Sequence, residues 1–116
     1  MVTALLITGG SGFLGWNLCQ AAVAAGYEVW TTCHRHTLDL PGVQTVQCDL
    51  TEAGAVEALL KAARFQGVIH AAAAASPDFC QEHARRSWRI NVEASGLLAA
   101  LAATRKIPFV FTSTDL

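Results

Sequence analysis

The chain has 116 residues, of which 53% are hydrophobic and 15% charged, and its formal net charge is −1. This size and composition are typical of one folded domain with a sizeable apolar core, and they exclude a disordered chain. A charge so close to zero also gives no sign of a surface for nucleic acid or acidic membranes.

Strand-like and helix-like segments alternate from the N-terminus. A short apolar run predicts a buried strand over residues 4–8, and apolar residues at helical spacing predict a helix over 13–25. β-branched and aromatic residues predict strands at 27–33 and 43–48. Only a loop punctuated by Pro41 and Gly42 separates these two strands, so no crossover helix is expected there.

The alternation continues in the second half of the chain. Thr51 is predicted to cap a helix that runs to about residue 64. A strand is expected over residues 67–70, a long helix over 81–104 and a last strand over 107–112. Strands joined by right-handed helical crossovers lie parallel, so this order predicts an α/β Rossmann fold, a doubly wound parallel sheet. The expected strand order is 3-2-1-4-5, with a ligand crevice where the first and fourth strands end.

The first predicted strand runs directly into the sequence TGGSGFLG, residues 8–15. Gly9 permits a sharp turn, Gly12 lets a pyrophosphate approach the backbone, and Gly15 lets the helix pack close to the sheet. The free N–H groups of the helix start then face the phosphates. The predicted pyrophosphate-binding residues are therefore Gly9, Gly12, Phe13, Leu14 and Gly15. The alternative is a turn that only links strand to helix, whereas a P-loop is excluded because Gly-Lys-Ser/Thr is missing.

The end of the second strand indicates the type of dinucleotide. Residues 31–36 read TTCHRH and contain no carboxylate to bond the ribose 2′-hydroxyl of NAD(H). Arg35 can pair with a 2′-phosphate, because its planar guanidinium matches the phosphate oxygens. NADP(H) is therefore favoured over NAD(H). The alternative is that Arg35 is only a surface charge.

TGGSGFLG resembles the signature of extended short-chain dehydrogenases/reductases, the NAD(P)-dependent epimerase/dehydratase superfamily, and further segments match in order. Asp49-Leu50 resembles the site whose aspartate bonds the adenine amino group. VIHAAA, residues 68–73, resembles the stretch that passes the cofactor ribose, which implies contacts from Ala71, Ala72 and Ala73. The resemblance covers the whole chain.

Two C-terminal segments complete the resemblance. INVEASGLLAALA, residues 90–102, resembles the helix whose asparagine, here Asn91, braces the active site. FVFTSTD, residues 109–115, resembles the strand that ends beside the cofactor at Thr112 and carries the catalytic hydroxyl, here Thr114. That hydroxyl would donate a hydrogen bond to a carbonyl oxygen as charge develops. The alternative for Thr114 is a turn that caps a following helix.

Within the superfamily, STD and PDFCQEHARRSWRINVEASG look most like the dTDP-4-dehydrorhamnose reductase branch. This resemblance implies NADPH binding and reduction of a nucleotide-sugar ketone. The branch also includes a regulatory subunit of methionine adenosyltransferase, so a non-catalytic cofactor-binding module is the alternative. The family's YxxxK pair is absent and the single tyrosine, Tyr27, opens a strand. We therefore expect residues 1–116 to be the truncated N-terminal part of an NAD(P)-binding Rossmann domain, inactive alone because its general acid is missing.

The remaining expectations concern surroundings and partners. The resemblance implies a possible homodimer through helix 81–104, whose apolar face would carry Ile90, Leu97, Leu98 and Leu101; packing on the sheet is the alternative. His70 is expected to be structural rather than a ligand contact. The sequence shows no targeting signal and no run of ~20 apolar residues, so we expect a cytoplasmic protein with reduced thiols. The cysteines lack metal-site spacing, and no metal ion is predicted: they are Cys19, Cys33, Cys48 and Cys80.

Overall fold

The computed structural model describes residues 4–9, 13–33, 40–71 and 92–112. The strands are β1 Ala4–Thr8, β2 Glu28–Cys33, β3 Val43–Gln47, β4 Phe65–His70 and β5 Phe109–Phe111. The helices are α1 Phe13–Ala24, α2 Ala53–Ala62 and α5 Ala94–Thr104. These elements follow the predicted order along the chain, and none of the helices in the described ranges is long and apolar enough to cross a membrane.

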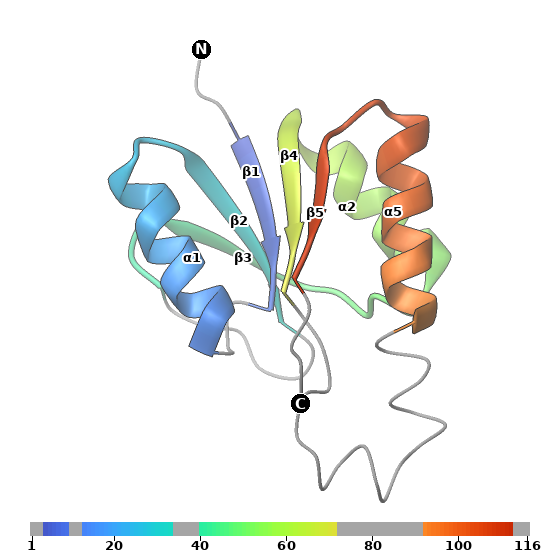
Figure 1. Cartoon of the computed structure of the whole chain (residues 1–116), viewed down its shortest axis with the longest axis horizontal. Helices are drawn as coiled ribbons and strands as arrows, with labels where there is room; N and C mark the ends of the chain where they lie inside the picture. Colours follow the sequence, from blue (N-terminus) through green and yellow to red (C-terminus); the bar gives the residue numbers. More distant parts are fainter. Residues whose placement is uncertain (1–3, 10–12, 34–39, 72–91, 113–116) are drawn as a thin grey trace, which may run out of the picture.

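The strands form one five-stranded sheet in the order β3-β2-β1-β4-β5, and every neighbouring pair is parallel. Helix α1 covers one face, and α2 and α5 cover the other (Figure 1). This is a Rossmann-type doubly wound sheet, so the predicted fold class and strand order are confirmed.

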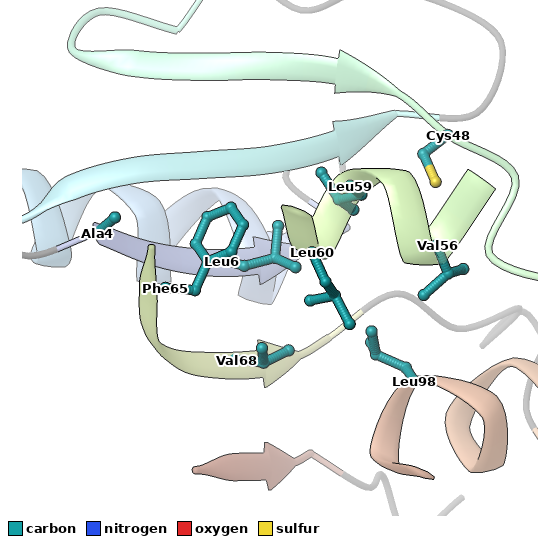
Figure 2. Packing of buried hydrophobic residues seen from close by; sticks show 9 residues of the cluster. All are labelled: Ala4, Leu6, Cys48, Val56, Leu59, Leu60, Phe65, Val68 and Leu98. Carbon is teal, nitrogen blue, oxygen red and sulfur yellow. The ribbon is translucent and has the colours of Figure 1, made fainter. Parts of the chain in front are cut away.

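The central strand β1 shows why its sequence is apolar at every position but the last. Ala4 and Leu6 belong to the core on the side of α2 and α5, where Figure 2 shows them together with Val68 and Leu98. Ile7 belongs to the smaller core on the α1 side, and Leu5 packs against that core. Alternate side chains of a strand point to opposite faces, so a strand between two helical layers has no polar face.

The main correction to the predicted elements concerns the start of α2. Thr51 does not cap this helix, because α2 begins at Ala53 and Glu52 occupies the N-cap position without a side-chain capping bond. The hydroxyl and the N–H of Thr51 both bind the side chain of Asp49 instead. The Thr51 hydroxyl donates its hydrogen to the Asp49 carboxylate, a strong acceptor, and Thr51 therefore belongs to the turn that precedes the helix.

The two C-terminal strands differ from their predicted bounds. β4 begins at Phe65 instead of Gly67, because the buried Phe65 pairs with Ala4 of β1. β5 begins at Phe109 rather than at Ile107, because the N–H of Ile107 binds the carbonyl of Ala102 at the end of α5. The predicted helix over residues 81–104 is described only from residue 92 onward.

The leucines expected on a dimer face pack inside this chain. Leu98 is fully buried in the core beside α2, and Leu97 and Leu101 are half-buried against the same cluster. These three leucines therefore pack within the chain, as the alternative to a dimer face predicted. Ile90 lies outside the described residues. Homodimer formation stays a prediction.

Candidate functional site

The candidate site lies at the carboxyl edge of the sheet. The parallel strands β1, β2, β4 and β5 all end there, and α1 and α5 begin there (Figure 1). From β1 the chain crosses to β2 on one side, whereas β4 leads to β5 on the other side. The two directions diverge between β1 and β4, which is the place where open α/β sheets bind ligands.

The glycine-rich turn begins at this point. Gly9 follows β1 with a φ of 79°, in the left-handed region that favours glycine, and its N–H donates to the Thr32 hydroxyl of β2 at 3.4 Å. Helix α1 opens at Phe13 and has no acidic residue in its first turn. Gly15 is buried, whereas the Leu14 side chain is exposed. A helix N-terminus without a carboxylate favours an anion in front of it.

A second predicted residue, Asp49, lies just after β3 and is half-buried. Its Oδ1 accepts hydrogen bonds from the N–H of Thr51 at 2.9 Å and from the Thr51 hydroxyl at 2.6 Å. Its backbone carbonyl accepts from the N–H of Glu52 at 3.0 Å. These bonds hold the carboxylate in one place at the edge of the sheet. Leu50, its neighbour, packs against the core, which gives it a structural part.

A polar network joins the ends of β1 and β4 to α5. The Thr8 hydroxyl lies 2.7 Å from Nδ1 of His70, and it also accepts the N–H of Ala71 at 2.9 Å. Nε2 of His70 lies 3.0 Å from the hydroxyl of Ser95 on α5. Burial lowers the pKa of His70, so the imidazole is neutral near pH 7. We call these three side chains, Thr8, His70 and Ser95, the Thr8–His70–Ser95 network.

The predicted residue Thr112 lies beside this network, directly after β5. Its N–H and its hydroxyl both donate to the carbonyl oxygen of His70, at 3.2 and 3.1 Å. Thr112 therefore fixes the end of β5 to β4, and Ala71 fixes the end of β4 to β1. Both residues also belong to the predicted site. Both ring nitrogens of His70 have hydrogen-bond partners within the chain, as is typical of a structural histidine; that it makes no ligand contact stays a prediction.

Six predicted site residues lie outside the described residues, and their roles stay predictions. They are Gly12, Arg35, Ala72, Ala73, Asn91 and Thr114. Of the described site residues, Gly9 comes directly after β1, Phe13, Leu14 and Gly15 form the start of α1, and Asp49 comes after β3.

The described cysteines are free thiols in the core: Cys19, Cys33 and Cys48. Burial raises the pKa of Cys19, and burial together with the neighbouring Asp49 raises that of Cys48. Within the described ranges, no cluster of three histidine, cysteine or acidic side chains could hold a metal ion. Cys80 lies outside these ranges.

Comparisons with known proteins agree with this geometry. A family model, described as the RmlD substrate binding domain, matches residues 3–116. The probable low-salt glycan biosynthesis reductase Agl14 of Haloferax volcanii is 32% identical over 111 residues, which are 94% of this chain and 36% of that protein. A hypothetical dTDP-4-dehydrorhamnose reductase from Sulfolobus tokodaii has a TM-score of 0.80 and 26% identity, with 94% of this chain and 38% of that chain covered.

A third relative is a UDP-glucose 4-epimerase from Thermus thermophilus, whose structure is a complex with NAD. It has a TM-score of 0.87 and 27% identity, with 97% of this chain and 38% of that chain covered. The chain thus spans little more than a third of the length of these relatives.

Proposed function

The chain belongs to the RmlD substrate binding domain family, and from this premise we propose that it binds a nicotinamide dinucleotide at the carboxyl edge of its sheet. We further propose that residues 1–116 are the dinucleotide-binding part of a nucleotide-sugar reductase. Two features of the chain after β1 carry the proposal. Gly9 has a φ of 79°, and the first turn of α1 has no acidic residue. The names of the relatives support the same chemistry, since they include two reductases and an epimerase in complex with NAD.

The residues around the turn suit the parts of such a cofactor. Main-chain N–H groups at the start of α1 would bind the pyrophosphate, with Gly12, Phe13 and Leu14 nearest to it. Gly15 is buried, and a glycine at this place of the fold lets the helix pack close to the sheet. Asp49, whose carboxylate is held by Thr51, would accept a hydrogen bond from the adenine amino group. The proposed ribose and nicotinamide contacts are Ala71, Ala72, Ala73, Asn91 and Thr112.

The proposed chemistry is reduction of a sugar ketone. A bound nicotinamide would supply the hydride, and the proton that completes the alcohol would come from a general acid outside residues 1–116. The Thr114 hydroxyl would donate a hydrogen bond to the ketone oxygen and so stabilise the negative charge that develops there. Thr112, two residues before Thr114, is itself fixed to the carbonyl of His70 at the end of β4.

The test compares two glycines with the same backbone requirement. Gly9 and Gly26 both have positive φ, and a Cβ at Gly26 would meet open space. Gly9→Ala and Gly26→Ala should therefore carry a similar backbone penalty of about 1 kcal/mol in the free energy of unfolding. Titration calorimetry with NADPH should show affinity lowered at least about tenfold in Gly9→Ala and unchanged in Gly26→Ala. Equal affinities of the two variants, or no binding by the unmodified chain, would contradict the proposal.

The same titration decides between the two cofactors. We propose that NADP(H) is preferred because residues 31–36 hold Arg35 and no carboxylate. Arg35→Ala should weaken NADPH binding and leave NADH binding unchanged, because only NADPH carries the 2′-phosphate. The matched control is Arg105→Ala, at an exposed position after the far end of α5, which should change neither affinity. NADH binding as tight as NADPH binding in the unmodified chain would overturn the preference.

A further inference from the structure

The Thr8–His70–Ser95 network is a largely buried set of polar side chains that the proposed cofactor contacts do not use. Its members come from β1, β4 and α5, and their atoms lie 2.7 and 3.0 Å apart. Thr8 precedes the glycine-rich turn, and His70 precedes the segment of Ala71. The network therefore ties together the two strand ends between which a dinucleotide would pass.

The surroundings of His70 favour the neutral ring. Within the described part of the chain, the groups that face it are the hydroxyls of Thr8 and Ser95 and the rings of Phe109 and Phe111, with centroids at 6.2 and 5.8 Å. None of these groups is charged. A proton on both ring nitrogens would add a charge to this apolar surrounding, which is costly.

Only the neutral ring can accept a hydrogen bond from one of the two hydroxyls and donate one to the other. The Thr8 hydroxyl already accepts the N–H of Ala71, and its hydrogen can donate to Nδ1 of His70. The N–H at Nε2 then donates to Ser95. A protonated ring carries donors at both nitrogens and no longer accepts from Thr8.

We infer that His70 is a positioning residue for the dinucleotide: through Thr8 and Ser95 it fixes the ends of β1 and β4 against α5 and so sets the affinity for the cofactor. This inference rests on the proposed function. It requires no contact between His70 and the cofactor, because the imidazole acts through the hydroxyl that precedes Gly9 and binds Ala71 N–H.

The experiment measures NADPH binding by titration calorimetry in variants of the network. Thr8→Val keeps the size of the side chain but loses the hydroxyl, and it should lower affinity about tenfold, because two buried polar partners lose their bond. Thr8→Ser restores the hydroxyl and should recover most of the affinity. The matched control is Thr104→Val, whose hydroxyl binds the Ala100 carbonyl at the exposed far end of α5 and should not matter.

A pH series separates positioning from a purely structural part. The affinity of the unmodified chain for NADPH should fall as the pH drops through the pKa of His70 in the folded chain, which burial holds below its ordinary value. His70→Asn should bind weakly, and its affinity should depend less on pH, because only the titration of the cofactor phosphates remains. Ser95→Ala, at a half-buried position, serves if Thr8→Val does not fold, and it should lower affinity several-fold. Circular dichroism confirms that each variant is folded.

The outcomes distinguish the two claims. Unchanged affinity in folded Thr8→Val or Ser95→Ala overturns the positioning role and leaves the proposed function standing. An acid dependence of affinity that is equally steep in His70→Asn overturns it as well. If the unmodified chain binds neither NADPH nor NADH, the proposed function fails, and the positioning role fails with it.

Discussion

The strands β1 and β5 have similarly apolar sequences and opposite surroundings. β1 lies in the centre, pairs with β2 and β4, and has Leu6 and Ile7 fully buried. β5 lies at the edge, pairs with β4 alone among the described strands, and leaves Val110 and Phe111 with 55% and 49% of their surface exposed. Apolar composition therefore indicates a strand, whereas the crossovers decide how much of it is buried.

The faces of β5 explain this difference further. Phe109 and Phe111 lie on the side of α5, where their rings contact His70. Val110 points to the other face, where α1 packs on β1 and β2. The edge strand thus has one face that contributes to the core and one face that is open, whereas the central strand is covered on both.

The largest effect that this comparison predicts is for Leu6→Ala. Leu6 is fully buried, so its truncation leaves a cavity and should lower the free energy of unfolding by about 3 kcal/mol. Urea denaturation followed by circular dichroism measures this loss. A loss below about 1 kcal/mol would mean that β1 is not the packed centre of the domain.

An intermediate effect is predicted for acid. The folded state lowers the pKa of His70, so the unfolded chain binds more protons once the pH falls below the ordinary value of about 6.5. The free energy of unfolding should therefore fall from pH 7 toward pH 5 and level off below the folded-state pKa. Urea denaturation of His70→Asn across the same range is the control, because it retains the other histidines. Parallel pH curves for the two proteins would contradict the prediction.

The smallest effect is predicted at the edge. Val110→Thr keeps a β-branched side chain at a position that is 55% exposed, so the free energy of unfolding should change by less than about 0.5 kcal/mol. Urea denaturation of Val110→Thr and Leu6→Ala under the same conditions compares the two losses in the free energy of unfolding. A loss similar to that of Leu6→Ala would show that this face of β5 is covered in solution.

The sequence predicted the fold well because the signals of this fold are local. The apolar run of residues 4–8, the glycines that follow it and the helical spacing of 13–25 each lie within a few residues. The alternation of strands and helices then sets the strand order through the handedness of crossovers. The structure places β1 and α1 where these patterns predicted them.

The features that sequence reasoning missed depend on partners or on competition. Thr8 and His70 are 62 residues apart, and His70 and Ser95 are 25 apart, so no pattern within one element shows their bonds. The cap of α2 was predicted wrongly because the turn that Asp49 forms with Thr51 precedes the helix, so the helix begins two residues later than the position of Thr51 suggests. Long-range side-chain pairing requires the tertiary structure.

The hydroxyl of Thr8 has a consequence for the tolerance of this chain to change. The neighbouring strands β1 and β4 end at Thr8 and His70. The hydroxyl oxygen of Thr8 contacts both the Nδ1 of His70 and the N–H of Ala71. A replacement at Thr8 therefore removes two contacts with the end of β4, which is remote from Thr8 in the sequence. In a mutational survey, this small residue should rank beside the large core residues in sensitivity.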